Sequence, residues 1–286
     1  MIQVPHIAPT FPRKAIYLNI KGGLGNQLFQ AAFGIVLREV FGARLGFLTE
    51  DFKRDTYGRV PMLGHFPVLQ EILAASPVPR QPVIFQESTA TTPEQAIVGL
   101  AEVLQANDEV VLDGYWQNPV LHRGFETLVK TAVTPAPPLG AAQDVSRIAQ
   151  AGAIGVHIRR SDYGHHGLVR AAYYSEAIKH IRSARGNMTP VLVFTDEPNF
   201  SAYILREIPN AQVVRGDPTA PIEDFARLCA CRDFVIANSS FSWWAATIGG
   251  TSASIVISPQ PWCLIDPHLD PAQGHWISVP NSVYAP

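Results

Sequence analysis

The segment VHIRRSDY places two arginines and an aspartate directly after a short apolar run. Arg159, Arg160 and Asp162 follow the run AIGVHI, which covers residues 153–158. Two adjacent guanidinium groups offer planar, permanently charged donors, which suit the oxygens of a phosphate. The segment is equally compatible with a solvated loop in which Asp162 pairs with an arginine.

Two further segments add a carboxylate and a series of hydroxyls. In VLVFTDEPNF, Asp196 follows an apolar run and can accept from a ribose hydroxyl or a guanine N–H edge, or it can cap the next helix. In FVIANSSFSWWAA, Ser239 and Ser240 precede a helix pattern, where hydroxyls and backbone N–H groups can bind an anion. A serine N-cap would explain only one of these two. Together, the three segments complement a nucleoside diphosphate.

The elements that must position these side chains follow a regular alternation. Short apolar runs alternate with helix patterns, which predicts a parallel sheet covered on both faces, and ligands of such sheets bind at the carboxyl ends of the strands. Trp243 and Trp244 fall inside a helix pattern and are predicted to be core residues. The predicted strands are 153–158, 190–194, 211–215, 233–237 and 253–258, and the predicted helices are 174–184, 200–207, 222–230 and 242–250.

A glycine-rich segment, GGLGNQLFQ, lies between a predicted strand at 15–20 and a predicted helix from Asn26 to Phe41. Asn26 is expected to cap this helix and Gly42 to end it. The segment lacks the dinucleotide-binding pattern G-x-G-x-x-G, because Leu28 occupies the third glycine position, and no G-K-[ST] follows. A dehydrogenase or an NTPase therefore loses its main support.

In place of those patterns, the turn offers glycine and an amide. Gly25 permits close approach of the backbone to a ligand, and Asn26 presents donors and acceptors at the helix start. Residues 43–112 alternate prolines and short apolar runs without a clean period, so only mixed structure is predicted there. A nucleotide in one domain and this turn in the other describe a cleft.

Length and composition favour two domains. The chain has 286 residues, of which 47% are hydrophobic and 16% charged, which is ample for more than one core. The run TPAPPLG at 134–140 holds three prolines in seven residues and suits an exposed connector. We therefore expect an N-terminal domain at 14–138 and a C-terminal domain at 139–286.

The overall charge and the cysteines restrict partners and compartment. A formal net charge of −2 gives no field that would gather nucleic acid or an acidic membrane, although peripheral association with a membrane stays open. No apolar run approaches the about 20 residues that span a bilayer, and the first residues lack a signal-peptide core. Cys229, Cys231 and Cys263 fit neither a zinc site nor a redox C-x-x-C pair, which favours buried thiols in a reducing cytoplasm.

Four motifs in this order, GGLGNQLFQ, VHIRRSDY, FTDEP and ANSSFSWWAA, closely resemble those of the α-1,2-fucosyltransferases of glycosyltransferase family 11. The resemblance runs from about Lys21 to Trp244. It implies an α/β, GT-B-like fold of two facing Rossmann-like domains with parallel sheets, the N-terminal one on the acceptor side and the C-terminal one binding GDP-β-L-fucose. The implied reaction is inverting transfer of fucose to the 2-hydroxyl of a sugar, usually a terminal β-galactose, in an oligosaccharide acceptor.

The resemblance also implies roles for individual residues. By this resemblance Arg159 stabilises the departing diphosphate, His157 and Asp196 contact guanine, and Asn26, with Gly25 beside it, reaches the donor from the N-terminal domain. Ser161 stands where the family commonly has glycine, which predicts a small change in loop stiffness. The remaining implied residues shape the loop or hold phosphate: Arg160, Asp162, Ser239, Ser240 and Phe241.

The chemistry of the reaction leaves some assignments open. No D-x-D-like pair follows a predicted strand, so no metal or other cofactor is expected besides the donor substrate. The acceptor hydroxyl has to lose a proton, and Glu50, Asp51, Asp113 and His165 are all candidates for the base. A highly dissociative transition state would make a strong base unnecessary.

Three alternative functions also stay open. They are a fucosyltransferase of α-1,6 or protein-O linkage, a catalytically silent GDP-sugar-binding module, and an oxidoreductase that shares the Rossmann half. The LFQAA and SFSWWAA contexts favour the 1,2 linkage, and the missing third glycine disfavours the oxidoreductase.

Overall fold

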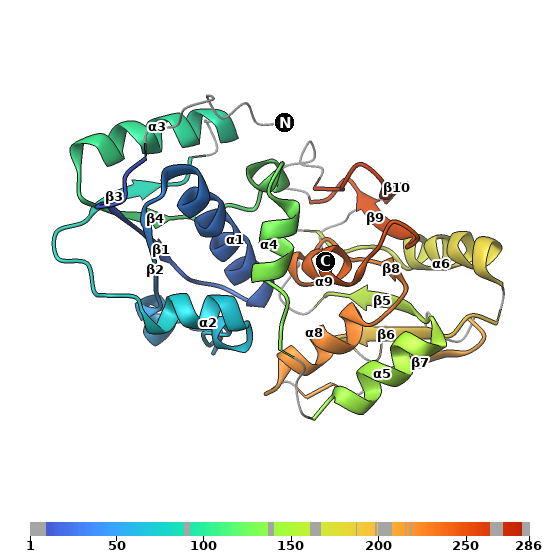
Figure 1. Ribbon diagram of the computed structural model, residues 1–286. Helices are drawn as coiled ribbons and strands as arrows, with labels where there is room; N and C mark the ends of the chain where they lie inside the picture. Colours follow the sequence, from blue (N-terminus) through green and yellow to red (C-terminus); the bar gives the residue numbers. More distant parts are fainter. Residues whose placement is uncertain are drawn as a thin grey trace. The chain divides into compact units, whose positions relative to one another are not determined.

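The computed structural model divides the chain into two compact units, residues 1–136 and 137–286 (Figure 1). The proline-rich run at 134–140 spans the division between them. The residues that the structure describes are 10–88, 92–136, 140–160, 167–186, 188–197, 199, 208–214, 216–217, 219–263 and 271–281.

Unit 1 is built on a parallel sheet whose described strands have the order β2-β1-β4-β3. Short apolar strands alternate with helices, which is the pattern of a parallel sheet in an α/β protein. Its elements are β1 (Ala15–Asn19), α1 (Leu24–Phe41), β2 (Arg44–Leu48), the 3-10 helices η1 (Glu50–Arg54) and η2 (Leu63–His65), α2 (Pro67–Ala74), β3 (Val83–Gln86), α3 (Pro93–Ala106), β4 (Glu109–Asp113), η3 (Pro119–His122) and α4 (Glu126–Ala132).

The helix α1 corrects one detail of the sequence-based prediction. Gly23 occupies the N-cap position and Asn26 lies inside the first turn, so the prediction that Asn26 caps this helix is wrong. A glycine can hold the cap position without a side-chain bond, which lets the helix begin two residues earlier than its apolar pattern suggests. The predicted end is confirmed, because Gly42 ends the helix in the left-handed region, with a φ of 62°.

Residues 43–112, for which only mixed structure was predicted, complete the sheet of unit 1. The strand β3 has a largely exposed sequence because it lies at the end of the strand order, so its apolar residues show no clear alternation. The helix α3 does carry a local signal, a capping box in which Thr92 and Gln95 bond each other's backbone N–H. Because β3 lies at one end of the sheet and the helices are short, the alternation of strands and helices in residues 43–112 could not be recognised from the sequence.

Unit 2 contains a second parallel sheet, in which the described strands have the order β10-β9-β8-β5-β6-β7. Figure 1 shows α6 on one side of this sheet and α5 and α8 on the other. The predicted helix at 200–207 lies outside the described residues, and β10 was not predicted. The elements are α5 (Ala142–Ala151), β5 (Ile154–Ile158), α6 (Ala171–Arg185), β6 (Val191–Thr195), β7 (Ala211–Val213), α8 (Pro221–Cys229), β8 (Asp233–Val235), α9 (Ser240–Gly249), β9 (Val256–Gln260) and β10 (Ile277–Pro280).

Aromatic side chains are buried in the core of unit 2. Tyr173 of α6 is buried, and its hydroxyl lies 2.8 Å from the carbonyl oxygen of Ile236 and 3.0 Å from that of Ile257. The prediction that Trp243 and Trp244 are core residues is confirmed, since both are buried in α9. The hydrogen bonds of Tyr173 tie α6 to β9 and to the residue that follows β8.

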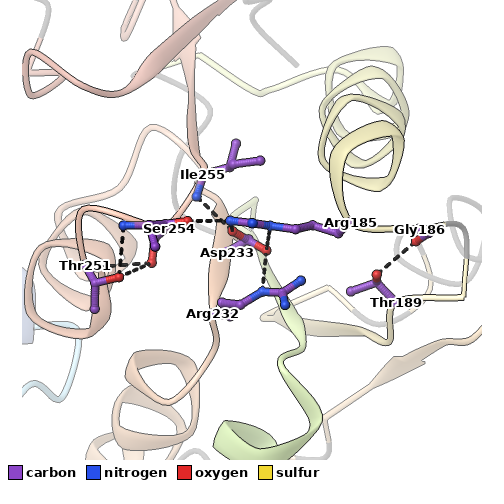
Figure 2. Close-up of polar contacts among 9 residues, drawn as sticks. Arg185, Gly186, Thr189, Arg232, Asp233, Thr251, Ser254 and Ile255 are labelled. Atoms are coloured by element: carbon purple, nitrogen blue, oxygen red, sulfur yellow. Dashed lines mark hydrogen bonds and ion pairs between the residues drawn. The ribbon is translucent and has the colours of Figure 1, made fainter.

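The amino-terminal end of β8 is held by a buried carboxylate, Asp233 (Figure 2). Arg185, the last residue of α6, donates two hydrogen bonds to it, and the Nε of Arg232 donates a third at 3.0 Å. The backbone N–H of Ile255 donates a fourth at 2.8 Å. This cluster ties α6 to the sheet at the end opposite to the polar segments.

Two further expectations from the sequence can be compared with the structure. Of the three cysteines, Cys231 is buried and Cys229 and Cys263 are partly exposed, so the expected burial holds for Cys231 alone. Burial raises the pKa of the Cys231 thiol, which keeps it protonated. In the described part of the chain, no helix is both long enough and apolar enough to cross a membrane.

Candidate functional site

The parallel pairing of β5 and β6 brings two of the predicted segments together. His157 pairs with Phe194 and Ile158 with Thr195, so the chain leaves both strands at the same level. Arg159 and Arg160 therefore emerge next to Asp196. This is the carboxyl end of the sheet of unit 2, where ligands of such sheets bind.

The carboxylate of Asp196 organises this strand end. Its Oδ1 accepts the backbone N–H of Arg160 at 2.9 Å, and its Oδ2 lies 3.1 Å from Nη1 of Arg159. The side chain of Arg159 is 31% exposed and that of Asp196 19% exposed. A planar cation is thus held in place at the strand end while still reaching solvent, and this arrangement can receive an anionic ligand.

His157 precedes this pair and is buried at the end of β5. Burial lowers the pKa of His157 to about 3, with a further contribution from the charge of Arg159 that Asp196 partly offsets. The imidazole is therefore neutral at physiological pH and offers one donor and one acceptor. Among the described residues, its Nδ1 atom has no hydrogen-bond partner.

The third segment begins α9 beside this histidine. The ring of Phe241 lies 5.3 Å from that of His157 and 5.2 Å from that of Phe225 of α8. Ser239 occupies the N-cap position with extended backbone and makes no side-chain capping bond, and the first turn holds no acidic residue. The positive end of the helix is thus not neutralised by a local carboxylate, which suits an anion.

The structure therefore brings most of the predicted donor-site residues of unit 2 to one end of the sheet. His157, Arg159, Arg160 and Asp196 are in mutual contact or adjacent, and Phe241 connects them to Ser239 and Ser240 at the start of α9. Asp162 and Ser161 lie outside the described residues, as does His165. In the described part of the chain, no group of three or more His, Cys, Asp or Glu residues could hold a metal ion.

The glycine turn in unit 1 is held by two buried glutamines. Gln27 donates to the carbonyl oxygens of Gly22 and Val60, and its Oε1 accepts the backbone N–H of Met62. Gln30 accepts the N–H of Lys21 at 2.9 Å and donates to its carbonyl at 3.1 Å. The carboxamides of this motif thus fix the backbone of the turn.

The two residues predicted to face the donor lie in the first turn of α1. Gly25 is buried, and Oδ1 of Asn26 accepts a hydrogen bond of 2.5 Å from Nε2 of Gln117. Gly22 has a φ of 79°, and a Cβ there would lie 2.8 Å from Nδ2 of Asn26. The turn therefore requires glycine at position 22.

A polar cluster lies at the carboxyl end of the sheet of unit 1, and sequence reasoning had named Asp51 and Asp113 in it as candidate bases but had missed Asn19, Lys21 and Tyr115. Lys21 and Asp113 form an ion pair of 2.6 Å, and Nδ2 of Asn19 lies 2.7 Å from Oδ2 of Asp51. Tyr115 lies beside Lys21. The strand-like run EVVLD before GYW was the available signal, but the strand could not be recognised within the irregular region.

These contacts divide the described candidates for the catalytic base into two groups. Asp113 and Asp51 both belong to the polar cluster at the strand ends, linked through Asn19. Glu50 instead pairs with the neighbouring Lys53, and both of these side chains are exposed. The structure thus distinguishes a strand-end pair of carboxylates from a surface ion pair.

Comparison with known proteins agrees with the four motifs. The family model described as glycosyl transferase family 11 matches residues 113–264. The O-antigen biosynthesis glycosyltransferase WbnK of Escherichia coli is 26% identical over 293 residues, covering 86% of this chain and 94% of the relative. An alpha-1,2-colitosyltransferase of Escherichia coli is 24% identical over 292 residues, covering 92% of this chain and 98% of the relative.

The fold is also similar to that of a solved structure. The crystal structure of POFUT1 in complex with GDP has a TM-score of 0.54 and 11% sequence identity, covering 87% of this chain and 99% of that chain. The α/β, GT-B-like fold class expected from the sequence is confirmed by this likeness and by the two parallel sheets.

Proposed function

The chain belongs to glycosyl transferase family 11, and from this premise we propose that it transfers L-fucose from GDP-β-L-fucose to the 2-hydroxyl of an acceptor sugar. The proposed acceptor is a terminal β-galactoside, and the reaction inverts the anomeric configuration without a metal. The observation that carries the proposal is the Arg159–Asp196 pair beside a neutral His157 at the carboxyl end of the sheet.

The donor nucleotide is assigned to the described residues of unit 2. The neutral imidazole of His157 can exchange hydrogen bonds with the edge of guanine, for which its buried Nδ1 atom supplies an unused position among the described residues. The start of α9, with Ser239 and Ser240, suits a phosphate because its first turn carries no acidic residue. Asp196 would accept from guanine while it holds Arg159, since each carboxylate oxygen has two lone pairs.

Arg159 is the proposed catalytic residue. Cleavage of the bond between fucose and phosphate develops negative charge on the β-phosphate and positive charge on the sugar. A preorganised cation stabilises the departing charge, and Asp196 fixes the guanidinium before the donor arrives. Because the guanidinium is partly exposed, it can contact phosphate oxygens without breaking this ion pair.

The linkage and acceptor are supported by the relatives. The α-1,2 linkage appears in the name of the colitosyltransferase, whose similarity extends over 92% of this chain. The same name supports a second candidate donor, an activated colitose, which is a fucose-like sugar. The name of the O-antigen glycosyltransferase supports a surface polysaccharide as the source of the acceptor.

The test is a GDP-release assay with GDP-β-L-fucose and a panel of β-galactosides, followed by determination of the product linkage by NMR. We expect GDP release that depends on the acceptor and an α-1,2-linked product. A parallel reaction with GDP-colitose separates the two donors. Binding of GDP without any acceptor-dependent release would leave the protein as a nucleotide-sugar-binding module and refute the proposal.

A further inference from the structure

The polar cluster at the carboxyl end of the sheet of unit 1 combines three strand ends. Asn19 ends β1, Asp51 follows β2 and Asp113 ends β4, and the amide of Asn19 lies 2.7 Å from Asp51 and 3.4 Å from Asp113. Lys21 completes the cluster through its ion pair of 2.6 Å with Asp113. The side chains of Lys21 and Asp113 are 28% and 31% exposed, so this pair is accessible from solvent.

An aromatic ring borders the ion pair. Tyr115 is 41% exposed, and the ammonium of Lys21 lies 5.4 Å from the centroid of its ring. A Cβ at Gly22 would lie only 3.1 Å from Cε1 of Tyr115, so the glycine turn leaves room for the ring. A large aromatic side chain that borders charged groups and stays exposed can serve a ligand with both apolar and polar surface.

The backbone that carries Tyr115 is fixed by another carboxylate. Glu87 accepts the N–H groups of Tyr115 at 2.7 Å and of Trp116 at 2.9 Å. Gly114 permits this contact, because a Cβ there would lie 2.7 Å from Oε2 of Glu87. The Tyr115 backbone is therefore in place before any ligand binds.

The next residue, Trp116, has a strained backbone conformation. Its φ of 54° is unfavourable for a bulky side chain, and backbone strain of this kind is typical of functional sites. Its buried ring packs 4.9 Å from that of Phe33, which anchors the strained residue in the core.

The charges of the cluster are also fixed. The hydrogen bond from Lys21 is the largest cause that lowers the pKa of Asp113, so its carboxylate stays ionised at physiological pH. Both described bonds to this carboxylate end on Oδ1, and its other oxygen is an acceptor for a hydroxyl. Lys21 is itself held through its backbone by Gln30.

We infer that Tyr115, Asp113 and Lys21 form a subsite for the acceptor, in which the ring covers the C–H face of a terminal pyranose and the ion pair binds its hydroxyls. A pyranose has this combination, a face of C–H groups and an edge of vicinal hydroxyls. The inference rests on the proposed function, since it names the acceptor contacts of the same reaction.

A second ion pair joins the same two strands. Lys14 and Asp108 form a pair of 2.9 Å at the amino ends of β1 and β4, with Asp108 88% exposed. This pair has the same charges and joins the same strands, but it lies at the opposite end of the sheet. It supplies a matched control for variants of Lys21 and Asp113.

The test compares Tyr115→Ala, Asp113→Asn and the control Asp108→Asn in steady-state kinetics with GDP-β-L-fucose and lactose. We expect Tyr115→Ala to raise the KM for lactose about tenfold or more. Asp113→Asn should lower kcat/KM for lactose by about ten- to a hundredfold, because it removes a charged acceptor. Tyr115→Phe should retain the wild-type KM for lactose, since it keeps the ring, and Asp108→Asn should behave as the wild type.

Two readouts separate this subsite from a structural role and from the donor site. The hydrolysis of GDP-β-L-fucose without acceptor should fall much less than transfer in Tyr115→Ala, whose thermal midpoint should stay that of the wild type, and both should be unchanged in Asp108→Asn. Parallel loss of hydrolysis and transfer, or an unchanged KM for lactose, would overturn the subsite. Saturation-transfer NMR with lactose and GDP needs no turnover, so loss of the lactose signal in Tyr115→Ala supports the subsite even if the wild type fails to use GDP-β-L-fucose.

Discussion

The sheet of unit 2 carries an arginine–aspartate cluster at each end of its strands, and the two clusters differ in burial and in the number of bonds. At the amino end, Asp233 is completely buried and accepts bonds from Arg185, Arg232 and the backbone of Ile255 (Figure 2). At the carboxyl end, Asp196 is 19% exposed and pairs with Arg159, which is 31% exposed. The same residue types thus form a closed cluster at one end and an accessible one at the other.

This difference follows from where the strands and helices begin. Arg185 ends α6 and approaches the start of β8, so its guanidinium serves to join helix and sheet. Arg159 leaves β5 into a loop at the end where ligands of parallel sheets bind. Arginine–aspartate pairing alone therefore does not identify a site, and exposure at the carboxyl end is the feature that does.

The largest effect is expected from Asp233→Ala. Removing one partner of a buried ion pair leaves uncompensated charge, here on Arg185, and typically costs about 3–5 kcal/mol of folding free energy. Chemical denaturation of the purified variant measures this loss. Asp144→Ala, which removes a half-exposed partner of Arg147 and Arg227, is the control and should cost about 1 kcal/mol or less. Equal losses in the two variants would contradict a structural role specific to Asp233.

Arg159→Ala should abolish transfer with little change in stability. Loss of a preorganised electrostatic partner typically reduces the rate on the order of 10²–10³-fold. Arg159→Lys should also be poor, because an ammonium cannot reproduce the two-pronged guanidinium. Steady-state GDP release and the thermal midpoint are the measurements, with Arg147→Ala on the surface of α5 as the control. A folded Arg159→Ala protein that retains wild-type turnover would remove the assignment.

The comparison of the two ends also explains what the sequence could predict. Arg159 and Asp196 were recognisable because they follow clear apolar runs, whereas His157, inside such a run, was named only through the family resemblance. Parallel pairing of β5 and β6 brings the three together. Asp233 was not singled out, since it is the first residue of its strand and two of its partners, Arg185 and Ile255, lie 48 and 22 residues away in sequence. Long-range partners of this kind depend on packing, which local pattern does not encode.

In unit 1, too, the local pattern revealed a motif but not its partners from distant parts of the chain. The glycine turn was visible from composition, but the bonds of Gln27 to Val60 and Met62 depend on a distant segment. Tyr115 was missed and Asp113 was named only as one of four candidate bases, because β4 lies in a part of the chain without a clear period. The N-cap at Gly23 shows a further limit, since Asn26 is a good capping residue by type and yet lies in the first turn.

The pH dependence of stability separates the two ends. His157 is neutral in the folded protein, with a pKa of about 3 because of burial, against about 6.5 in the unfolded chain. Between these values the unfolded state binds the extra proton, so stability falls as the pH falls from 6.5 toward 3, by up to about 1.4 kcal/mol per pH unit. Urea denaturation of His157→Gln at several pH values should show a shallower slope than the wild type in this range.

The carboxylate of Asp233 affects the stability of the fold at a lower pH than His157 does. Burial alone would raise its pKa, but the bonds from Arg185, Ile255 and Arg232 lower it overall. Its folded pKa lies below its unfolded value of 3.8, so its stabilisation is present above that value and is lost as the pH falls through the folded pKa.

An identical slope between pH 6.5 and 4.5 in His157→Gln and the wild type would contradict the assigned neutrality of His157.

The smallest effect is expected from Asp196→Asn. The carboxamide oxygen can still accept the N–H of Arg160, so the loop keeps its anchor, but the charge that orients Arg159 is lost. Because this pair is partly exposed, its loss should change the folding free energy by about 1 kcal/mol or less. We expect kcat for transfer to fall about tenfold, since Arg159 is retained but held less firmly. In the double variant Asp196→Asn/Arg159→Ala, kcat should equal that of Arg159→Ala alone, because Asp196 acts on the chemical step through that guanidinium, whereas its contact with guanine affects the KM for the donor. Additive losses in kcat would instead give Asp196 a role in the chemical step that is independent of Arg159.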